Sequence, residues 1–332
     1  MAITTKALIW TDIKKMAVED REPEDPKPGF VTLKVNYAGI CGSELSAFVG
    51  QNELRKPPSI MGHEFTGKVV KVGSDSDRYL LGKNVAVNPL VTCGKCRYCR
   101  TGNRQLCPDR KLIGVDYPGG FEEYVNVPDY SCYEIVEKPE GSLAEPLATA
   151  FRAVFHAMPK IDDKALIIGA GTIGLLSAKL LETYGTVDRV VVDINDYRLE
   201  HALHWGATKV INSKKEKNIP KDFDVVIDAV GTQDTRMMAI SSVARGGRVV
   251  FVGLHEPQAA VPVNYMIRSE IETYGSFCYS DDNFRRSVDL INRGFLDINE
   301  RWYDIRPLEK GEDSFNEELS PDSRYSKIIL KP

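Results

Sequence analysis

The sequence predicts an α/β protein of two domains, and three observations lead to this fold class. The chain has 332 residues, which is enough for two domains that each bury a core. From Ala2 to about Val136, short apolar runs alternate with turn residues. After Glu145-Pro146 the pattern changes to strand-like runs separated by segments of helical length. Such an alternation is typical of a doubly wound parallel sheet.

The first part of the chain is predicted to be mostly β structure. Strand-like runs lie at 31–35, 67–72 and 85–87. Clusters of proline and glycine at 22–29 and 117–120 separate such runs, because these residues fix or free the backbone angles that turns require. We therefore expect short strands joined by tight turns.

The second part is predicted to alternate strands with helices. The expected strands and the first helix follow in chain order at 165–168, 172–183 (the helix), 189–192, 225–227 and 249–252. The C-terminal segment begins with a helix-like stretch at 281–291 and ends in a strand candidate at 327–330. Periodicity is compatible with a return of this segment to the first domain but does not establish it.

Composition and charge restrict the classes of partner. Lys and Arg number 43 against 47 Asp and Glu, so no overall basic field exists to hold a nucleic acid or an anionic membrane. The N-terminus does not resemble a signal peptide, and no apolar stretch approaches about 18 residues, so we expect a cytoplasmic protein. In that compartment thiols stay reduced, and the seven cysteines are better explained by metal binding than by disulfides.

A glycine-rich loop predicts a dinucleotide site. The segment Gly169-Ala170-Gly171-Thr172-Ile173-Gly174 follows a buried-strand pattern and opens a helix pattern. The first glycine permits a tight turn, the second lets backbone amides approach a pyrophosphate, and the third lets helix and strand pack closely. The helix N-terminus then favours the negative charge of the cofactor. Gly169, Gly171, Thr172, Ile173 and Gly174 are the predicted contacts.

After the helix that follows the glycine loop, the next strand ends at Asp193. A carboxylate at this position would accept hydrogen bonds from the ribose of the cofactor. Asp193 would repel a ribose 2′-phosphate, so the sequence favours NAD over NADP. Arg198 lies close enough in sequence to contact the cofactor and weakens that distinction. The alternative, in which the glycines only mark turns and Asp193 only caps a helix, explains fewer of these features together.

Four cysteines predict a structural zinc site. Cys93, Cys96, Cys99 and Cys107 are spaced C-x2-C-x2-C-x7-C, so four thiolates can surround one tetrahedral ion. Four sulfur ligands leave no position for a substrate. Six basic residues surround the cluster and raise the alternative of a zinc module that binds nucleic acid: Lys95, Arg97, Arg100, Arg104, Arg110 and Lys111. Against this, a second paired knuckle is absent, and these cations can balance the charge of the thiolates.

A second set of residues suggests an open zinc site. Cys41, His63 and Glu64 lie on turn-rich segments of the β domain, and Glu145 lies at the domain junction. A catalytic zinc takes three protein ligands and keeps one position for water or substrate. A single cysteine or histidine more often packs in a core, so both interpretations stay open on spacing alone.

Taken in order, the motifs resemble those of the zinc-containing medium-chain alcohol and polyol dehydrogenases, in particular the sorbitol dehydrogenase-like branch. The resemblance spans nearly the whole chain and is carried by the Gly169 loop, the four-cysteine lobe and these segments: Gly39-Ile40-Cys41-Gly42-Ser43-Glu44, Met61-Gly62-His63-Glu64-Phe65, Pro118-Gly119-Gly120-Phe121-Glu122-Glu123-Tyr124 and Glu145-Pro146-Leu147. Glu145 stands where classical alcohol dehydrogenases have a cysteine.

The resemblance implies a fold and a set of roles. A GroES-like catalytic domain would comprise residues 1–147, a Rossmann NAD-binding domain residues 148–280, and residues 281–332 would return to the catalytic domain. The active site would lie in the cleft between the domains. Cys41, His63 and Glu145 would surround the catalytic zinc, with Glu64 as an alternative ligand. Ser43 would pass the alcohol proton outward, and Thr149 would lie near the nicotinamide.

One departure from the family pattern affects the proton relay. Members often carry Asp-x-His after the Cys-Gly-Ser motif, whereas this chain has Glu44-Leu45-Ser46, so a histidine relay is not carried over. Five residues near the motifs are candidates for the substrate pocket: Phe48, Arg55, Asp116, Tyr117 and Arg152. For Arg55 a solvated surface position is an equally good explanation.

The sequence therefore predicts an enzyme with two zinc ions that transfers hydride between a secondary alcohol, of polyol or sugar type, and NAD. A polyol phosphate is the alternative substrate, and a non-catalytic protein that binds NAD and zinc is the alternative function. A homodimer or homotetramer is expected from the family.

Overall fold

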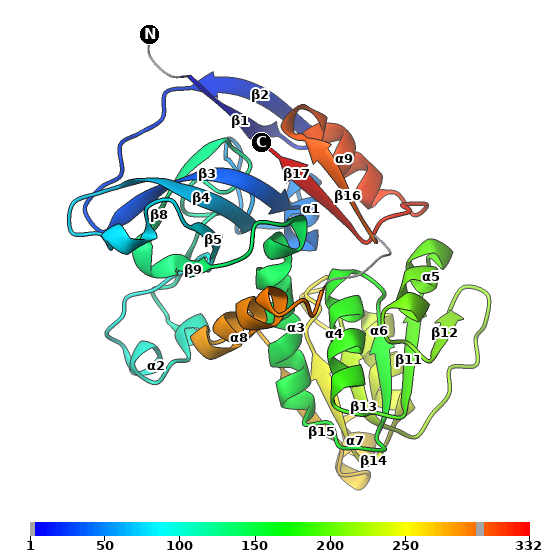
Figure 1. Cartoon of the computed structure of the whole chain (residues 1–332). Helices are drawn as coiled ribbons and strands as arrows, with labels where there is room; N and C mark the ends of the chain where they lie inside the picture. Colours follow the sequence, from blue (N-terminus) through cyan, green and yellow to red (C-terminus); the bar gives the residue numbers. More distant parts are fainter. Residues whose placement is uncertain (1–3, 297–301) are drawn as a thin grey trace. The chain divides into compact units, whose positions relative to one another are not determined.

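The computed structural model describes residues 4–296 and 302–332 (Figure 1). The chain divides into two compact units, which we describe separately. The β unit comprises Met1–Glu145, Ser280–Pro321 and Lys327–Pro332, and the α/β unit comprises Pro146–Tyr279 and Asp322–Ser326.

A seven-stranded sheet forms the centre of the β unit. Its strand order is β16-β17-β3-β4-β5-β9, and β8 also pairs with β3. The strands are β3 (Phe30–Gly39), β4 (Glu64–Val72), β5 (Asn84–Val87), β8 (Tyr124–Pro128), β9 (Cys132–Glu134), β16 (Tyr303–Pro307) and β17 (Lys327–Lys331). In Figure 1 the C-terminal β17 lies beside β3, with which it pairs antiparallel.

Two further strand pairs and, among the described residues, four α-helices also belong to the β unit. The pairs are β1 (Thr5–Asp12) with β2 (Lys15–Arg21), and β6 (Leu90–Val91) with β7 (Lys111–Leu112). The helices are α1 (Gly42–Phe48), α2 (Arg97–Arg100), α8 (Asp281–Asn292) and α9 (Gly311–Leu319). Aromatic packing joins early and late parts of the chain, because the buried Phe315 ring of α9 lies 5.1 Å from Phe48 and 6.0 Å from Phe121.

The α/β unit contains a six-stranded sheet in which all neighbours are parallel. Its order is β12-β11-β10-β13-β14-β15. The strands are β10 (Lys164–Ile168), β11 (Asp188–Asp193), β12 (Lys209–Asn212), β13 (Phe223–Asp228), β14 (Val243–Phe251) and β15 (Glu272–Gly275). The helices are α3 (Ala144–Ala157), whose first two residues belong to the β unit, α4 (Thr172–Thr183), α5 (Asp196–His204), α6 (Gln233–Ser242) and α7 (Val263–Arg268).

This sheet confirms the predicted doubly wound arrangement. The chain runs from β10 outward to β12 and then returns to β13 beside β10, which creates a switch point between β10 and β13. Runs of valine, isoleucine and leucine lie in the inner strands β10, β11, β13 and β14, because both faces of a parallel sheet are covered. The core includes Leu166, Val192 and Val226, each no more than 2% exposed.

Most of the expected strands and helices lie where the sequence placed them, and the helix predicted at 172–183 coincides with α4. The hairpin of β1 and β2 and helix α1 were not predicted, because their apolar residues lack a clear period. In the described parts of the chain, the helices are either too short or too polar to cross a bilayer.

Candidate metal centres and cofactor site

The four predicted cysteines converge in the β unit. Their sulfur atoms all lie within 4.8 Å of one another, and three of the separations are 3.9 Å for Cys93 to Cys99, 3.4 Å for Cys96 to Cys99, and 3.5 Å for Cys107 to Cys93. Zinc–sulfur bonds of about 2.3 Å place tetrahedral sulfurs about 3.8 Å apart. No described cysteine forms a disulfide. The geometry therefore fits one structural zinc ion.

The backbone around this lobe favours thiolate ligands. Backbone N–H groups of Lys95 and Cys96 lower the pKa of Cys93 to about 6. The short helix α2 begins after Cys96, whose sulfur accepts a hydrogen bond from the Cys99 amide. Some of the surrounding cations also have partners, since Arg104 forms an ion pair of 3.0 Å with Asp281. This lobe is closed, with four ligands and no remaining coordination position.

The second cluster is made of Cys41, His63 and Glu64, whose ligand atoms also lie within 4.8 Å of one another. Strand pairing brings them together, because the register of β3 with β4 sets Gly39 opposite Glu64, and Cys41 follows shortly after β3 ends. A Cβ atom on Gly39 would lie 2.7 Å from a carboxylate oxygen of Glu64, so glycine leaves room for this carboxylate. The donor set of thiolate, imidazole and carboxylate fits a zinc ion with a fourth position open.

Glu44 orients the imidazole of His63. Its carboxylate lies 2.6 Å from Nδ1 of His63 and also accepts hydrogen bonds from the backbone amides of Cys41 (3.0 Å) and Gly62 (2.8 Å). Nδ1 is thereby used as a donor, which leaves Nε2 as the ligand atom. Burial would raise the pKa of Glu44, but His63 and Arg55 lower it to about 2. For His63, burial lowers the pKa, while Glu44 and Cys41 raise it more strongly.

Lys327 from the end of the chain reaches Glu64. The two side chains are each 2% exposed, and Nζ of Lys327 lies 2.5 Å from Glu64 Oε2 and 2.6 Å from the carbonyl oxygen of Ile40. Burial would lower the pKa of Lys327, but Glu64 and Cys41 raise it above its usual value. Lys327 and Glu64 are far apart in the sequence, and sequence analysis did not identify this pair.

The predicted dinucleotide loop has the expected geometry. Gly169 has a φ of +98°, and a Cβ on Gly174 would lie 1.8 Å from the carbonyl oxygen of Gly169, so neither position accepts a side chain. Around Gly171 the space is open within 4 Å. Helix α4 begins at Thr172 without a side-chain cap, which leaves its first amides available to an anion.

These features agree with comparisons to known proteins. Residues 27–137 match the family "Alcohol dehydrogenase GroES-like domain", and residues 172–293 match the family "Zinc-binding dehydrogenase". A zinc-type alcohol dehydrogenase-like protein of Escherichia coli is 32% identical, covering 95% of each chain. This chain belongs to the zinc-containing medium-chain alcohol and polyol dehydrogenase family.

Two further relatives extend the comparison. Sorbitol dehydrogenase of Bacillus subtilis is 29% identical to this dehydrogenase, over 98% of this chain and 97% of the relative. A zinc-binding dehydrogenase of Sinorhizobium meliloti, solved with bound NADP, is similar with a TM-score of 0.91 and 27% identity, covering 99% of this chain and 100% of that one. The dehydrogenase is thus a zinc-dependent oxidoreductase of alcohol CH–OH groups that uses a nicotinamide cofactor.

Two of the remaining predicted residues occupy helix α3 of this dehydrogenase. Glu145 lies in the first turn of α3 and, within the described residues, stands outside the three-residue ligand group of Cys41, His63 and Glu64. Thr149 lies one turn further along and is half-buried. The hydroxyl of Ser43 lies 3.4 Å from the sulfur of Cys41, which places it at the metal cluster.

The candidates for the substrate pocket have different surroundings. Phe48 is fully buried and its ring packs on Phe315, so its prediction as a pocket residue was wrong. Asp116 is exposed and accepts a hydrogen bond of 2.8 Å from a backbone amide of its own loop, and Tyr117 is half-buried. Arg152 lies on α3, where burial lowers its pKa.

Asp193 ends β11 beside the glycine loop. One of its carboxylate oxygens accepts a hydrogen bond from the Ala170 amide (2.6 Å), and the other accepts from the amides of Ile194 and Asn195. The carboxylate therefore already stabilises the loop, and the oxygen that has one donor retains a lone pair for a ribose hydroxyl. The buried Nε of Arg198 has no hydrogen-bond partner in the described structure.

The C-terminal segment also contacts the glycine loop, which sequence analysis missed. The Thr172 hydroxyl donates to the carbonyl oxygen of Ser326 (2.8 Å), and the Ser326 hydroxyl donates to that of Ala170 (3.2 Å). Asn195 donates to the carbonyl oxygen of Ser323 at 2.9 Å. The Thr172 hydroxyl therefore donates its proton to the protein backbone, not to a cofactor. No local pattern at 322–326 indicated this contact.

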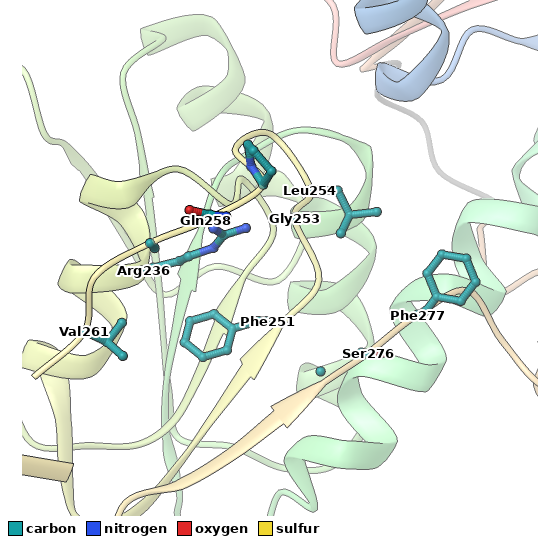
Figure 2. Close-up of a pocket in the computed structure, with 11 residues that line it drawn as sticks. Arg236, Phe251, Gly253, Leu254, Gln258, Val261, Ser276 and Phe277 are labelled. Atoms are coloured by element: carbon teal, nitrogen blue, oxygen red, sulfur yellow. The ribbon is translucent and has the colours of Figure 1, made fainter. Parts of the chain in front are cut away.

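A cavity of about 420 Å³ lies beyond the carboxyl ends of β14 and β15 (Figure 2). It is lined by Arg236, Phe251, Gly253, Leu254, Pro257, Gln258, Ala259, Val261, Gly275, Ser276 and Phe277. The Ser276 hydroxyl is buried and has no partner among the described residues. Ligands of doubly wound sheets bind at this edge, so the cavity lies on the side expected for a cofactor.

Proposed function

We propose that this dehydrogenase oxidises a secondary alcohol of polyol or sugar type and transfers the hydride to NAD. The observation that carries the proposal is the group of Cys41, His63 and Glu64, which supplies three ligands and no fourth among the described residues. When bound there, zinc supplies Lewis-acid stabilisation of a deprotonated alcohol. A binding protein without catalysis would have no physical need for such an open set.

The proposed roles of the surrounding residues follow from their positions. Cys41, His63 and Glu64 hold the metal, and the Ser43 hydroxyl takes the alcohol proton and passes it outward. Glu145, which the family resemblance implies as a ligand, is the proposed alternative to Glu64. Thr149 is proposed to contact the nicotinamide. Residues 1–147 with 281–332 would act as the catalytic domain, and 148–280 as the NAD-binding domain.

NAD is the proposed cofactor, because the carboxylate of Asp193 would repel a 2′-phosphate. The pyrophosphate would bind at Gly169, Gly171 and the amides of Thr172, Ile173 and Gly174, and the nicotinamide half would extend toward the cavity of Figure 2. Arg198, with its unpartnered Nε, is the residue that could favour NADP. Replacing Arg198 by alanine should leave the KM for NAD within about threefold if NAD is the cofactor.

We further propose a cytoplasmic homo-oligomer, a dimer or tetramer. Within the described chain, strand β15 pairs with another strand on one side only, and most of its residues are exposed. Helix α7 also has exposed apolar residues, since Val263 is 56% and Ile267 68% exposed. An open strand edge next to exposed apolar residues is a site where a second copy can pair. Light scattering of the purified chain would measure its mass, and Ile267→Asp should lower that mass if α7 lies in the contact.

The first experiment combines zinc content per chain with NAD reduction on polyols, polyol phosphates and simple secondary alcohols. About two zinc ions and turnover with a polyol would support the proposal and define the substrate class. Turnover only with polyol phosphates would show that the substrate is a polyol phosphate and not a free polyol. One chelator-resistant zinc without turnover on any of the panel would favour a protein that binds NAD and zinc without catalysis.

A further inference from the structure

Arg55 is buried beside the open metal cluster, although its sequence context allowed a solvated position. The residue lies in the loop between α1 and β4 and is 5% exposed. Its Nε donates to the carbonyl oxygen of Gly114 and its Nη1 to that of Ser43, both at 3.4 Å. Its Nη2 lies 3.4 Å from Nδ1 of His63. One guanidinium therefore touches three separate segments of the β unit.

The contact with His63 brings charge rather than a hydrogen bond. Nδ1 of His63 donates its proton to Glu44 at 2.6 Å, so it does not also accept one from Arg55. The guanidinium instead lies along the same edge of the ring. It places a positive charge next to the Glu44–His63 hydrogen bond.

The buried charges around the cluster explain why a cation is needed at the position of Arg55. Two buried carboxylates belong to the cluster or adjoin it, and burying a carboxylate is costly unless a positive charge compensates it. Glu64 has the ammonium of Lys327 at 2.5 Å. Glu44 has the imidazole of His63 at 2.6 Å, and the guanidinium of Arg55 lies 3.4 Å from the same imidazole nitrogen. The cluster thus contains one permanent cation for each of these two carboxylates.

We propose that Arg55 is a positioning residue for the open zinc site. Its guanidinium links three segments, namely the first turn of α1 at Ser43, the loop at Gly114 and the imidazole edge of His63. Its positive charge also compensates the negative charge of Glu44. An arginine suits this task because its planar fork presents donors in several directions, whereas a lysine offers one compact charge. This inference rests on the proposed zinc site, but it goes beyond the ligands themselves.

The test compares Arg55→Met, which removes charge and fork, with Arg55→Lys, which keeps the charge. Arg306→Met is the matched control, because Arg306 belongs to the same unit, is 17% exposed and forms ion pairs with Asp304 and Glu317 away from the metal ligands. Three readouts need no turnover: zinc per chain, the rate of zinc release to a chelator, and the visible spectrum after Co²⁺ replaces zinc. The fourth readout is the pair of kinetic constants kcat and KM, measured with sorbitol and NAD as substrates.

Positioning predicts that Arg55→Met releases the open-site zinc about 10- to 100-fold faster and changes the Co²⁺ bands of that site, since outer contacts of metal ligands have effects of this size. kcat should fall while the KM for NAD stays unchanged. Arg55→Lys should recover part of the slow zinc release but not kcat. The control Arg306→Met should lower thermal stability without changing the Co²⁺ spectrum.

Two results would overturn the inference. If Arg55→Met lowered only the melting temperature, with wild-type zinc release and Co²⁺ bands, Arg55 would be a structural residue of the loop. If it raised only the KM for sorbitol, with wild-type zinc release and Co²⁺ bands, the guanidinium would be a substrate contact. Failure of the proposed reaction looks different, because wild-type protein would then lack turnover while the metal readouts could still respond to Arg55.

Discussion

The two metal clusters of the β unit differ in ligands, in neighbours and in how the chain builds them. The four-cysteine lobe draws its ligands from the single segment 93–107, and all four are thiols. The open cluster has one thiol, one imidazole and one carboxylate, and it is bordered by three charged, buried residues: Glu44, Arg55 and Lys327. The first arrangement stabilises a fold, and the second supports chemistry.

The difference shows that coordination number alone does not define a catalytic site. Around the lobe, most cations are exposed, and Arg104 forms a partly exposed ion pair with Asp281. Around the open cluster, each charge is matched within the protein, as in the pair of Glu64 and Lys327. An enzyme needs this because a site that excludes water must hold its own charges in fixed positions.

The largest expected effect separates the two clusters by function. Replacing His63 by alanine should lower kcat/KM at least about a thousandfold, because several kcal/mol of charge stabilisation disappear and each 1.36 kcal/mol is a factor of about ten. Zinc should fall from two ions to one per chain, and NAD affinity, measured by fluorescence titration, should change less than twofold. Loss of both zinc ions would contradict the independence of the clusters.

The corresponding change in the lobe should affect stability. Cys99→Ser should lower the melting temperature by roughly 10 °C or more, because structural zinc sites contribute several kcal/mol to folding and 1 kcal/mol corresponds to about 2–4 °C in a chain of this class. Below the new melting temperature, kcat should remain within about threefold of wild type. Cys132→Ser is the matched control, since this thiol lies outside both clusters. A loss of kcat as large as that of His63→Ala would contradict a purely structural role.

The same comparison explains what the sequence could predict. The lobe follows from spacing, because its cysteines are close in the chain and their side chains have few other uses. The glycine loop and α4 also follow from local pattern, as do the parallel strands of valine and isoleucine. For these features the local sequence and the fold require the same residues.

The neighbours of the open cluster could not be predicted in this way. Lys327 reaches Glu64 only because β17 pairs with β3, and that pairing joins the last strand of the chain to one of its first. Arg55 looks like a surface residue in the sequence, and it is buried because the loop that carries it packs against Gly114 and His63. Glu44 differs from the family's aspartate by one methylene group, and no periodicity identifies it as the partner of His63. Contacts at long sequence separation carry no local signal.

A third prediction tests how the open cluster balances its charges. Lys327→Met should destabilise the zinc-free protein by about 3–5 kcal/mol, because Glu64 would remain as a buried charge without its cation. The loss should be smaller when zinc is bound, since the metal then compensates the carboxylate. Urea unfolding with and without a chelator would measure both values.

Lys331→Met provides the control for this variant, because Lys331 is exposed at the end of the same strand. We expect it to change the free energy of unfolding by less than about 0.5 kcal/mol. Equal destabilisation of Lys327→Met with and without zinc would indicate that Glu64 and the metal do not share charge.

The smallest expected effect concerns a buried carboxylate that lies outside both clusters. Glu122 is 6% exposed, and its ion-pair partner Arg21 lies 3.8 Å away. Burial raises the pKa of Glu122 from 4.5 to about 8, in contrast to Glu44, whose partners lower its pKa. Between these two values the folded protein binds more protons than the unfolded chain, so stability falls as the pH rises from about 4.5 to about 8.

Glu122→Gln should remove this dependence. At pH 8 the variant should be more stable than the wild type by about 1 kcal/mol or more, since one pKa unit corresponds to about 1.36 kcal/mol, and at pH 5 the two should be nearly equal. Melting temperatures across this pH range would measure the effect, with the exposed Glu22→Gln as control. A wild type whose stability does not fall over this range would mean that Arg21 compensates Glu122 as fully as Lys327 compensates Glu64. The contrast between paired carboxylates at the open cluster and a poorly paired one elsewhere would then disappear.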